Sequence, residues 1–324
     1  MTKQLQIRRR VFQALFFILF IVAPVLNIFR IDITRSQVIL FGHEWHLGIA
    51  NLIDGTVSGM DGAINLILRG FIPVALFVFV FGLIAWRYGR LYCGWLCPHF
   101  SVVEMINGLM RRASRRPNLW EKAPLPEKNP DGSAIHTDRR YWWLAGLAII
   151  GFAFLWALVL LTYLLPPRDI YANLVTFSLT PNQIIFLAAA TSVLSLEFLL
   201  ARHLFCRFGC AVGVFQSLLW MANRRAMVVG FNRTRAADCR GCDSQCEVVC
   251  PMRLKPRSNK RHMFTCTECG QCLSACQQVQ AGHEPQQAPL LQWVSGQCAL
   301  DVSARDFGQR PVIPNNCYQR PVQY

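Results

Sequence analysis

The chain has 324 residues, of which 53% are hydrophobic and 16% charged, and its formal net charge is +15. This apolar composition is typical of membrane proteins and argues against an ordinary water-soluble domain. The basic residues stand in blocks beside the apolar runs, as membrane topology requires, so the charge does not indicate nucleic-acid binding. No pattern resembles an acid, a base or a nucleophile in a substrate pocket, so hydrolytic and group-transfer chemistry have no support.

Four apolar stretches are long enough to cross a bilayer core, which takes roughly 17–25 residues. They are approximately Val11–Phe29, Phe71–Trp86 with an apolar lead-in from Ile64, Tyr141–Leu165 and Ile184–Leu200. Arginine and lysine gather before the first stretch, between the second and third, and after the fourth, whereas the other two connections are poor in both. By the positive-inside rule, both termini and the central loop are predicted to be cytoplasmic.

An internal repeat links the second and fourth stretches. The segment RLYCGWLCPHFSVVEMINGLMRR (Arg90–Arg112) aligns without a gap with HLFCRFGCAVGVFQSLLWMANRR (His203–Arg225). Each copy follows an even-numbered span on the predicted cytoplasmic side, so the membrane part is expected to contain two repeated hairpins, each ending in a cysteine pair. The aligned Cys-x3-Cys pairs are Cys93 with Cys97 and Cys206 with Cys210.

Eight of the fourteen cysteines lie between Asp238 and Gln278. Disulfides are disfavoured in the cytoplasm, so these thiols indicate metal binding. Three closely spaced cysteines hold one [4Fe-4S] cluster, and the fourth cysteine of each run ligates the other cluster in two-cluster ferredoxins. This crossed pattern predicts two sites, the first formed by Cys239, Cys242, Cys246 and Cys276, the second by Cys266, Cys269, Cys272 and Cys250.

A zinc ribbon is the alternative for this segment, because Cys239 with Cys242 and Cys266 with Cys269 form two Cys-x2-Cys pairs. A ribbon would leave four cysteines without a role, so clusters are favoured. The first run is one residue longer between Cys242 and Cys246, and the loop geometry or potential of its cluster is expected to differ. The surrounding basic residues are expected either to attract an anionic partner or to anchor the segment to anionic lipid.

The two Cys-x3-Cys pairs allow three interpretations. If each segment is helical, its two thiols share one face at positions i and i+4, where they can bind copper as Cu(I) or carry reducing equivalents as a dithiol. The third interpretation is that each is an inert buried cysteine. His99, Met105 and Met110 are further candidate ligands beside the first pair, although a methionine at helical spacing more often packs.

Two other groups receive no chemical role from the sequence. His43 and His46 lie in a predicted external loop and are interpreted as surface residues, with a metal or a quinone headgroup as the alternative. Cys298 and Cys317 have no partner spacing.

The predicted fold class is mainly α: a helical integral membrane protein of about four spans in two repeated hairpins, with a small α+β two-cluster ferredoxin domain. Residues 1–222 are expected to form the membrane domain, and residues 223–280 the cytoplasmic ferredoxin-like domain with two [4Fe-4S] clusters. Residues 281–324, rich in glutamine and proline, are expected to form an irregular tail.

The chain resembles the membrane polyferredoxin family, which includes the CcoG, FixG and RdxA cytochrome oxidase accessory proteins and, more distantly, NapH and NosR. The resemblance rests on RRRVFQALFFILFIVAPVLN with ILFGHEWHLG, on GRLYCGWLCP, on FCRFGC with VFQS, and on the eight-cysteine segment, together about residues 7–280. It implies a bacterial inner-membrane protein with a cytoplasmic double-cluster domain. It also implies reduction of Cu(II) for assembly of a cbb3-type oxidase in one branch, and quinol oxidation in the other.

Three features depart from the family pattern. Ala211 stands where the second Cys-x3-Cys motif is usually followed by proline. The first cluster run is one residue longer than usual, and an immunoglobulin-like C-terminal domain, as in the CcoG branch, is not expected. These departures weaken the specific assembly role more than the family resemblance.

The sequence therefore predicts a membrane-bound iron-sulfur electron-transfer protein, and the resemblance to the CcoG branch implies cupric reduction as its chemistry. Its expected partners are membrane lipid, a cytoplasmic electron donor, and either oxidase assembly factors or the quinone pool. The rivals are a quinol-oxidising subunit and a non-redox metal-binding assembly factor.

Overall fold

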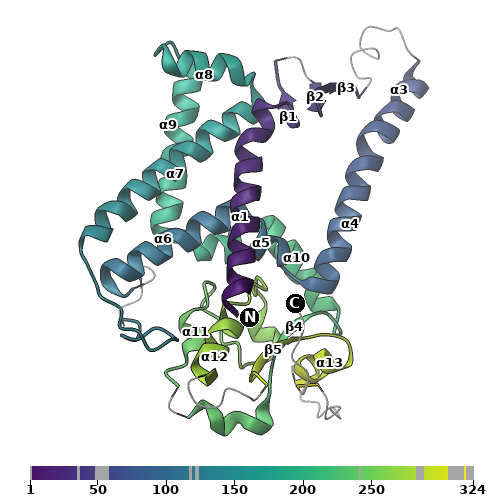
Figure 1. Cartoon of the computed structure of the whole chain (residues 1–324). Coiled ribbons are helices and arrows are strands. Elements are labelled where there is room, and N and C mark those ends of the chain that lie inside the picture. The colour runs from purple at the N-terminus through teal and green to yellow at the C-terminus, as the bar shows by residue number, and fades with distance from the viewer. Residues whose placement is uncertain are drawn as a thin grey trace. The chain divides into compact units, whose positions relative to one another are not determined.

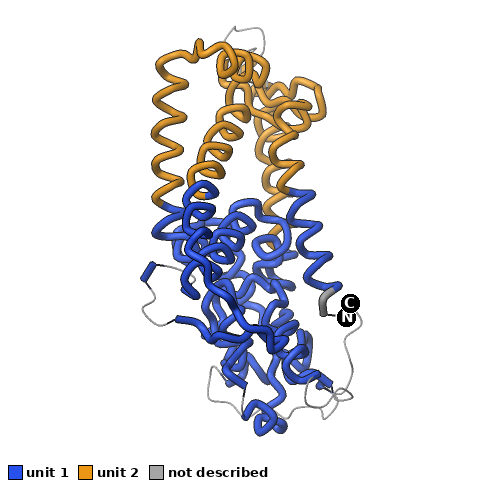
Figure 2. Tube along the Cα trace, turned by 60° about the vertical axis from the view of Figure 1, so that its left-hand side comes forward, with its two compact units in different colours: residues 1–16, 83–148, 197–324 blue, residues 17–82, 149–196 orange. Residues whose placement is uncertain are grey.

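The computed structural model describes residues 2–34, 37–47, 58–116, 119–120, 124–240, 242–281, 288–305 and 317–318 (Figure 1). The chain is mainly helical, as predicted. Its residues group into two compact units, which are coloured separately in Figure 2 and described one at a time below. Unit 1 comprises residues 1–16, 83–148 and 197–324, and unit 2 comprises residues 17–82 and 149–196. The domain boundaries at 223 and 281 stay predictions, because both units draw on segments far apart in the chain.

Three helical stretches in the described part of the chain are long and apolar enough to cross a membrane: Gly59–Tyr88, Arg140–Leu164 and Pro181–Ala201. They match the second, third and fourth predicted spans. The first helix, α1 (Thr2–Val25), is not among them, because it carries a basic block in its first half and ends before strand β1 begins at Phe29. The total of four spans therefore stays a prediction.

The helices of the apolar stretches follow from composition. Helix α7 (Arg140–Leu164) is apolar on all sides, and Asp138 caps its start by accepting a hydrogen bond from the backbone N–H of Arg140 at 2.9 Å. The other two stretches run through a π-helical segment. The elements are α3 (Gly59–Leu66), η1 (Ile67–Phe71) and α4 (Ile72–Tyr88) in one, and α9 (Pro181–Leu196) and η2 (Glu197–Ala201) in the other.

Unit 2 also contains a small antiparallel sheet and one short helix. Strands β1 (Phe29–Asp32), β2 (Gln37–Leu40) and β3 (His43–Trp45) pair in that order, and α8 (Pro167–Val175) lies between α7 and α9 in sequence. Within unit 2, the ring of Phe20 stacks on Tyr163, and Ile170 and Leu187 are buried against residues of α7.

The cysteine-bearing segments of unit 1 are short. Each repeat folds as a helical turn followed by a longer helix: α5 (Leu91–Trp95) with α6 (Pro98–Ser114), and η3 (Phe205–Gly209) with α10 (Ala211–Ala222). The eight-cysteine segment contains η4 (Arg233–Cys239), α11 (Gln245–Val248), η5 (Lys260–Met263) and α12 (Gln271–Ala281).

A two-stranded antiparallel sheet closes this part of unit 1. Strand β4 (Val228–Phe231) pairs with β5 (Leu291–Val294), and Val228, Val229 and Trp293 join the buried core that also holds Cys246 and Cys272. The irregular tail predicted for residues 281–324 is wrong in this respect, since it contains β5 and helix α13 (Gln297–Ala304). Strand β5 forms because its pairing with β4 covers apolar side chains, and a local reading of composition does not register such a distant partner.

Candidate functional site

The first cavity of the eight-cysteine segment is lined by the four thiols predicted for the first cluster: Cys239, Cys242, Cys246 and Cys276. Three of them come from η4, the loop after it and α11, while the fourth projects from α12. The extra residue of this run is accommodated at Ser244, which takes a left-handed backbone conformation with φ of 52°. Burial raises the pKa of Cys246 to about 12 and that of Cys276 to about 11.

One cation stands at the edge of this cavity. Arg257 donates hydrogen bonds to Ser244 Oγ at 2.9 Å and to Glu247 Oε1 at 2.8 Å, so the guanidinium is held beside the loop that carries the extra residue. Its charge lowers the pKa of Cys246, against the larger effect of burial. The buried thiols therefore keep their protons in the absence of a metal, and they become thiolates when a metal replaces those protons.

The second cavity is lined by the other predicted set: Cys250, Cys266, Cys269 and Cys272. The rest of its wall is largely apolar and includes Met252, Leu254 and Met263. Burial raises the pKa of Cys269 to about 11 and raises that of Cys266 and Cys272 well above the usual range.

The donor sets of both cavities fit [4Fe-4S] clusters. Each cavity offers four soft thiol donors. Three come from one cysteine run, where the backbone turns tightly, and the fourth comes from the other run, which is the arrangement of two-cluster ferredoxins. The structure thus brings together the residues of both sequence-predicted sets, while their role as ligands stays a prediction.

Each Cys-x3-Cys pair follows the same course. The helical turn ends before the second cysteine, and Cys97 and Cys210, with ψ of 117° and 109°, become the N-cap residues of α6 and α10. The interpretation of each pair as two thiols on one face of a continuous helix is therefore wrong. Pro98 and Ala211 start the new helices, and proline favours such a break because it is accepted in the first turn of a helix.

The four thiols of the two pairs lie together in unit 1. All six pairs among Cys93, Cys97, Cys206 and Cys210 lie within electrostatic reach of each other. Burial raises the pKa of Cys93 to about 12 and also raises the pKa of Cys206. The sequence repeat signalled that the pairs correspond, but it did not predict that they meet.

Side chains of one repeat contact the cysteines of the other. Gln216 Nε2 donates to Cys93 Sγ at 3.5 Å, and His99 Nδ1 lies 3.5 Å from Cys206 Sγ. The other ring nitrogen of His99 lies 2.9 Å from Glu197 Oε2. The ring of the predicted candidate His99 thus lies beside Cys206 of the second pair, while its backbone N–H bonds to Cys97 of the first.

The first Cys-x3-Cys turn approaches the second cavity closely. A Cβ atom on Gly94 would lie 2.1 Å from the carbonyl oxygen of Thr267, so only glycine fits here. Trp95 Nε1 donates to the carbonyl oxygen of Glu268 at 3.0 Å. The thiols of Cys97, Cys206, Cys250 and Cys266 all pack against one buried cluster of Phe100, Met252 and Leu254.

Buried polar side chains of α1 bind both the first Cys-x3-Cys turn and the wall of the second cavity. Arg9 is fully buried and donates to both carboxylate oxygens of Glu104, and its Nη1 reaches the carbonyl oxygen of Gly94 at 3.3 Å. Gln6 Nε2 donates to the carbonyl oxygen of Cys269 at 3.2 Å. Because a buried charge is costly unless it is paired and hydrogen-bonded, these contacts fix the turn against the second cavity.

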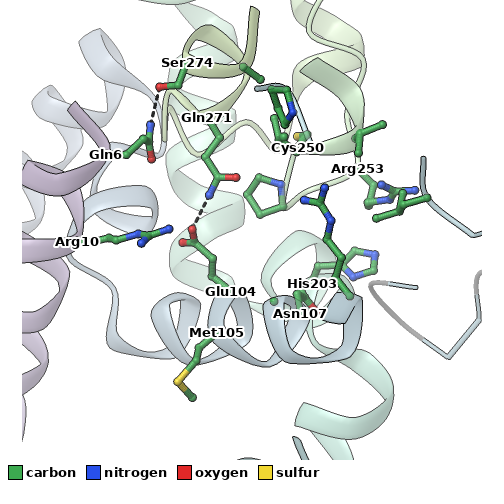
Figure 3. Close-up of a pocket in the computed structure, with 18 of the residues that line it drawn as sticks. Gln6, Arg10, Glu104, Met105, Asn107, His203, Cys250, Arg253, Gln271 and Ser274 are labelled. Atoms are coloured by element: carbon green, nitrogen blue, oxygen red, sulfur yellow. Dashed lines mark hydrogen bonds between the residues drawn. The ribbon is translucent and has the colours of Figure 1, made fainter. Parts of the chain in front are cut away.

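A polar cavity of about 630 Å³ lies next to Cys250 (Figure 3). On one side, Glu104 accepts a hydrogen bond from Gln271, and Gln6 donates one to Ser274, as the dashed lines show. Four arginines contribute to its lining, namely Arg10, Arg111, Arg112 and Arg253. Burial and the neighbouring Arg253 lower the pKa of Arg111, so the cavity concentrates positive charge and suits an anionic or carbonyl-bearing molecule.

The remaining candidates lie away from these thiols or take structural roles. Met110 is buried and its sulfur lies 2.8 Å from Arg202 Nη1, whereas Met105 lines the polar cavity. His43 and His46 belong to unit 2 and are exposed.

Two cysteines that had no predicted role form a disulfide. Cys298 and Cys317 are bonded across a separation of 19 residues, while the other twelve cysteines are free. A loop closed in this way depends on the fold around it, so spacing alone gives no signal for the pair.

The described residues show no group of three histidine, cysteine, aspartate or glutamate side chains spaced to hold a single metal ion.

Comparison with known proteins supports the chemistry of one segment directly. The 4Fe-4S binding domain family matches residues 69–117, the segment that holds Cys93 and Cys97. The chain is also similar to two uncharacterized proteins of Methanocaldococcus jannaschii. One is 24% identical over 278 residues, covering 84% of this chain and 93% of the relative, and the other is 24% identical over 276 residues, covering 84% and 85%. No solved structure matches the chain significantly.

The chain thus carries a 4Fe-4S binding domain, and this indicates an iron-sulfur electron-transfer protein. Its three apolar helices are consistent with a membrane protein.

Proposed function

We propose that the protein is a membrane-bound electron carrier whose two four-thiol cavities each hold a [4Fe-4S] cluster. The observation that supports this proposal most directly is the convergence of all eight cysteines on two separate cavities in the crossed pattern. The ligands would be Cys239, Cys242, Cys246 and Cys276 for the first cluster, and Cys250, Cys266, Cys269 and Cys272 for the second. Such clusters take up and release single electrons.

The chain's own residues set the surroundings of these clusters. Apolar side chains such as Met252 and Leu254 exclude water from the second cavity, while Arg257 places a cation beside the first. Burial and local charge are the means by which a protein adjusts cluster potentials, so the two sites are expected to differ in potential. Helix α12 supplies ligands to both cavities and thereby connects them.

The proposed activity is reduction of Cu(II) to Cu(I), in which one electron from a cytoplasmic donor passes through the clusters to each copper ion. The chemistry of the Cys-x3-Cys thiols supports this choice, because soft sulfur ligands prefer Cu(I). We further propose that the eight-cysteine segment faces the cytoplasm of a bacterial inner membrane. It lies at the same ends of the apolar helices as the basic blocks, and such blocks face the cytoplasm in membrane proteins. Assembly factors of a cbb3-type oxidase would then receive the copper.

A second candidate function is oxidation of a quinol, and the polar cavity beside Cys250 favours it. Its volume of about 630 Å³ lies in the range of small-molecule sites, and its arginines can donate hydrogen bonds to quinone carbonyl oxygens. Each quinol would yield two electrons, which pass singly to the clusters, and two protons, which leave to water in the open cavity.

Anaerobic purification in detergent tests these functions. Iron and acid-labile sulfide are measured, the protein is reduced with dithionite and examined by EPR, and Cu(II) and an oxidised quinone are then added to separate samples. Loss of the reduced-cluster signals on addition of Cu(II) is the expected result, and loss with quinone alone would favour the second function. Zinc or copper without iron would instead indicate a non-redox metal-binding assembly factor and contradict both.

A further inference from the structure

We propose that the two repeats jointly hold a third [4Fe-4S] cluster, with one pair of ligands from each: Cys93 and Cys97 from the first, Cys206 and Cys210 from the second. The inference deepens the proposed electron-transfer function and rests on it. It replaces two separate cysteine pairs by a single four-thiol site whose halves are more than a hundred residues apart in the chain. Thiols that ligate a cluster cannot also bind Cu(I), so the third cluster would then pass the electron to copper instead of the Cys-x3-Cys pairs binding the ion.

The contacts between the repeats are reciprocal. Arg90, at the start of the first repeat, donates from Nε to Ser217 Oγ at 2.5 Å and from Nη1 to the carbonyl oxygen of Cys206 at 2.7 Å. In the other direction, Gln216 of the second repeat donates to Cys93 Sγ. Gly213 allows this approach, because a Cβ atom there would lie 3.1 Å from Arg90 Nη1. The two cysteine turns are therefore held together by specific hydrogen bonds.

A buried cation with an unused donor adjoins three of the four thiols. Arg90 is 1% exposed, and its Nη2 has no hydrogen-bond partner. Its guanidinium interacts electrostatically with Cys93, Cys206 and Cys210, and also with Cys266 of the second cavity. A buried donor without a partner is energetically costly, so a group that accepts its hydrogen bond would stabilise it. A cluster with four thiolate ligands carries net negative charge, which would stabilise this guanidinium.

The spacing and the family match favour a cluster over a single ion. Tetrahedral coordination with metal–sulfur bonds of about 2.3 Å places the sulfur atoms about 3.8 Å apart. Among the described residues, no three histidine, cysteine, aspartate or glutamate side chains lie close enough together to hold a single ion. A four-iron cluster takes thiols that are farther apart. The 4Fe-4S domain family matches the segment that contains Cys93 and Cys97, yet that segment supplies only two cysteines. The second repeat provides the other two.

The position of this site gives the third cluster a role. Cys97 and Cys206 pack against the same side chains, Phe100, Met252 and Leu254, as Cys250 and Cys266 of the second cavity. The three sites therefore form a series in unit 1: the first cavity, the second cavity, and the site of the two repeats. A single electron that leaves the second cluster would reach the third before any acceptor at the membrane.

Metal stoichiometry of the purified full-length protein tests the inference. The wild-type protein is expected to contain about twelve iron and about twelve sulfide per chain, and Cys206→Ser and Cys93→Ser are each expected to lower both numbers to about eight. The double variant with Cys298→Ser and Cys317→Ser controls for the loss of cysteine elsewhere and should leave the iron content unchanged. Equal losses from either repeat would show that the site is shared.

Three other results would overturn the inference in distinguishable ways. About eight iron in the wild-type protein, unaffected by Cys206→Ser, would leave the electron-transfer function intact and remove only the third cluster. About eight iron with one copper or zinc that is lost in Cys206→Ser would assign the shared site to a single ion. No iron at all would contradict the proposed function itself.

A second variant covers the case in which a cysteine substitution prevents folding. Arg90→Gln removes the cation and its hydrogen bonds between the repeats but no ligand, so its iron content should lie between that of Cys206→Ser and that of the wild-type protein. Without the positive charge, the reduced form of a nearby cluster is less stable, so the EPR signal that Cys206→Ser lacks should shift to lower potential in a redox titration. The matched variant Arg139→Gln changes an exposed arginine outside the site and should shift none of the signals. Identical titrations for Arg90→Gln and the wild-type protein would contradict the placement of the cluster.

Discussion

The two units divide apolar surface and chemistry between them. All fourteen cysteines belong to unit 1, together with the four basic side chains in the described residues that are less than 2% exposed: Arg9, Arg90, Arg202 and Lys260. Unit 2 contains no cysteine, and its helices expose large apolar side chains, such as Phe77 at 71% and Ile185 at 66%. Exposed apolar surface of this extent is typical of contact with lipid, whereas buried cations beside thiols are typical of a site that holds negative charge.

The difference means that variants can separate the two properties. Metal content should depend on unit 1 alone, while membrane insertion should depend on the apolar helices, which unit 2 largely provides. Lys260 illustrates how firmly unit 1 is built around its cysteines: its Nζ donates to the carbonyl oxygens of Trp220 and Asn223 and lies 4.5 Å from the centre of the Trp220 ring. That side chain fixes the segment between the two cluster runs to helix α10.

The largest effect is expected from removal of a thiol in the second cavity. Cys269→Ala should lower the iron and sulfide content by about four each, because the thiol is buried and no free cysteine outside the ligand sets can replace it. Membrane extraction in detergent should be unchanged. Cys298→Ala is the control for loss of a thiol outside the cavities. Unchanged iron in Cys269→Ala would contradict the assignment of that cavity.

An arginine in the middle of an apolar helix should impair membrane insertion and leave the metal content unchanged. Leu76 is 60% exposed in α4 and lies within the stretch Gly59–Tyr88. Leu76→Arg should make the free energy of membrane insertion less favourable by about 3–4 kcal/mol. Met60→Arg, near the end of the same stretch, should have a much smaller effect because the arginine can reach the interface. Carbonate extraction of membranes measures both, and equal retention of Leu76→Arg and Met60→Arg would argue against a spanning helix.

How much could be read from the sequence depends on the range of the interactions. The two ligand sets of the eight-cysteine segment follow from local spacing, and the apolar stretches follow from composition. The meeting of the Cys-x3-Cys pairs does not, because contacts such as Arg90 with Cys206 join residues separated by 116 positions. The repeat was the available signal, and it predicts correspondence rather than contact. The helix break before Cys97 could have been anticipated from Pro98, but the same break before Cys210 has no proline.

The tail shows the same limit, and its disulfide tests the orientation of unit 1. If the tail faces the cytoplasm, Cys298 and Cys317 should be reduced in living cells and form their bond only after exposure to air. Closing a loop with a separation of 19 residues should then stabilise the folded tail by about 3 kcal/mol. Mass spectrometry after acid quenching and alkylation of whole cells measures the redox state. A bond already present in cells would place the tail, and the clusters beside it, on an oxidising side.

The smallest effect concerns the junction between the first repeat and the second cavity. Gly94→Ala should destabilise unit 1 by about 1–3 kcal/mol, because its Cβ atom would lie 2.1 Å from the carbonyl oxygen of Thr267, in the loop between two cluster ligands. Gly108→Ala is the matched control in α6. A Cβ atom there meets no other atom within 4 Å, so this change should be neutral or stabilise the helix by up to about 1 kcal/mol.

Denaturation of the two glycine variants, followed by the loss of visible cluster absorbance, distinguishes a local clash from a general effect of adding a methyl group. Gly94→Ala should release its clusters at lower denaturant concentration than the wild-type protein, and Gly108→Ala should not. The aligned position in the second repeat is Arg207, a large side chain, so the close approach is specific to the first repeat. If the two variants release their clusters at the same denaturant concentration, the first repeat does not contact the second cavity through Gly94, and electrons would need another route between these sites.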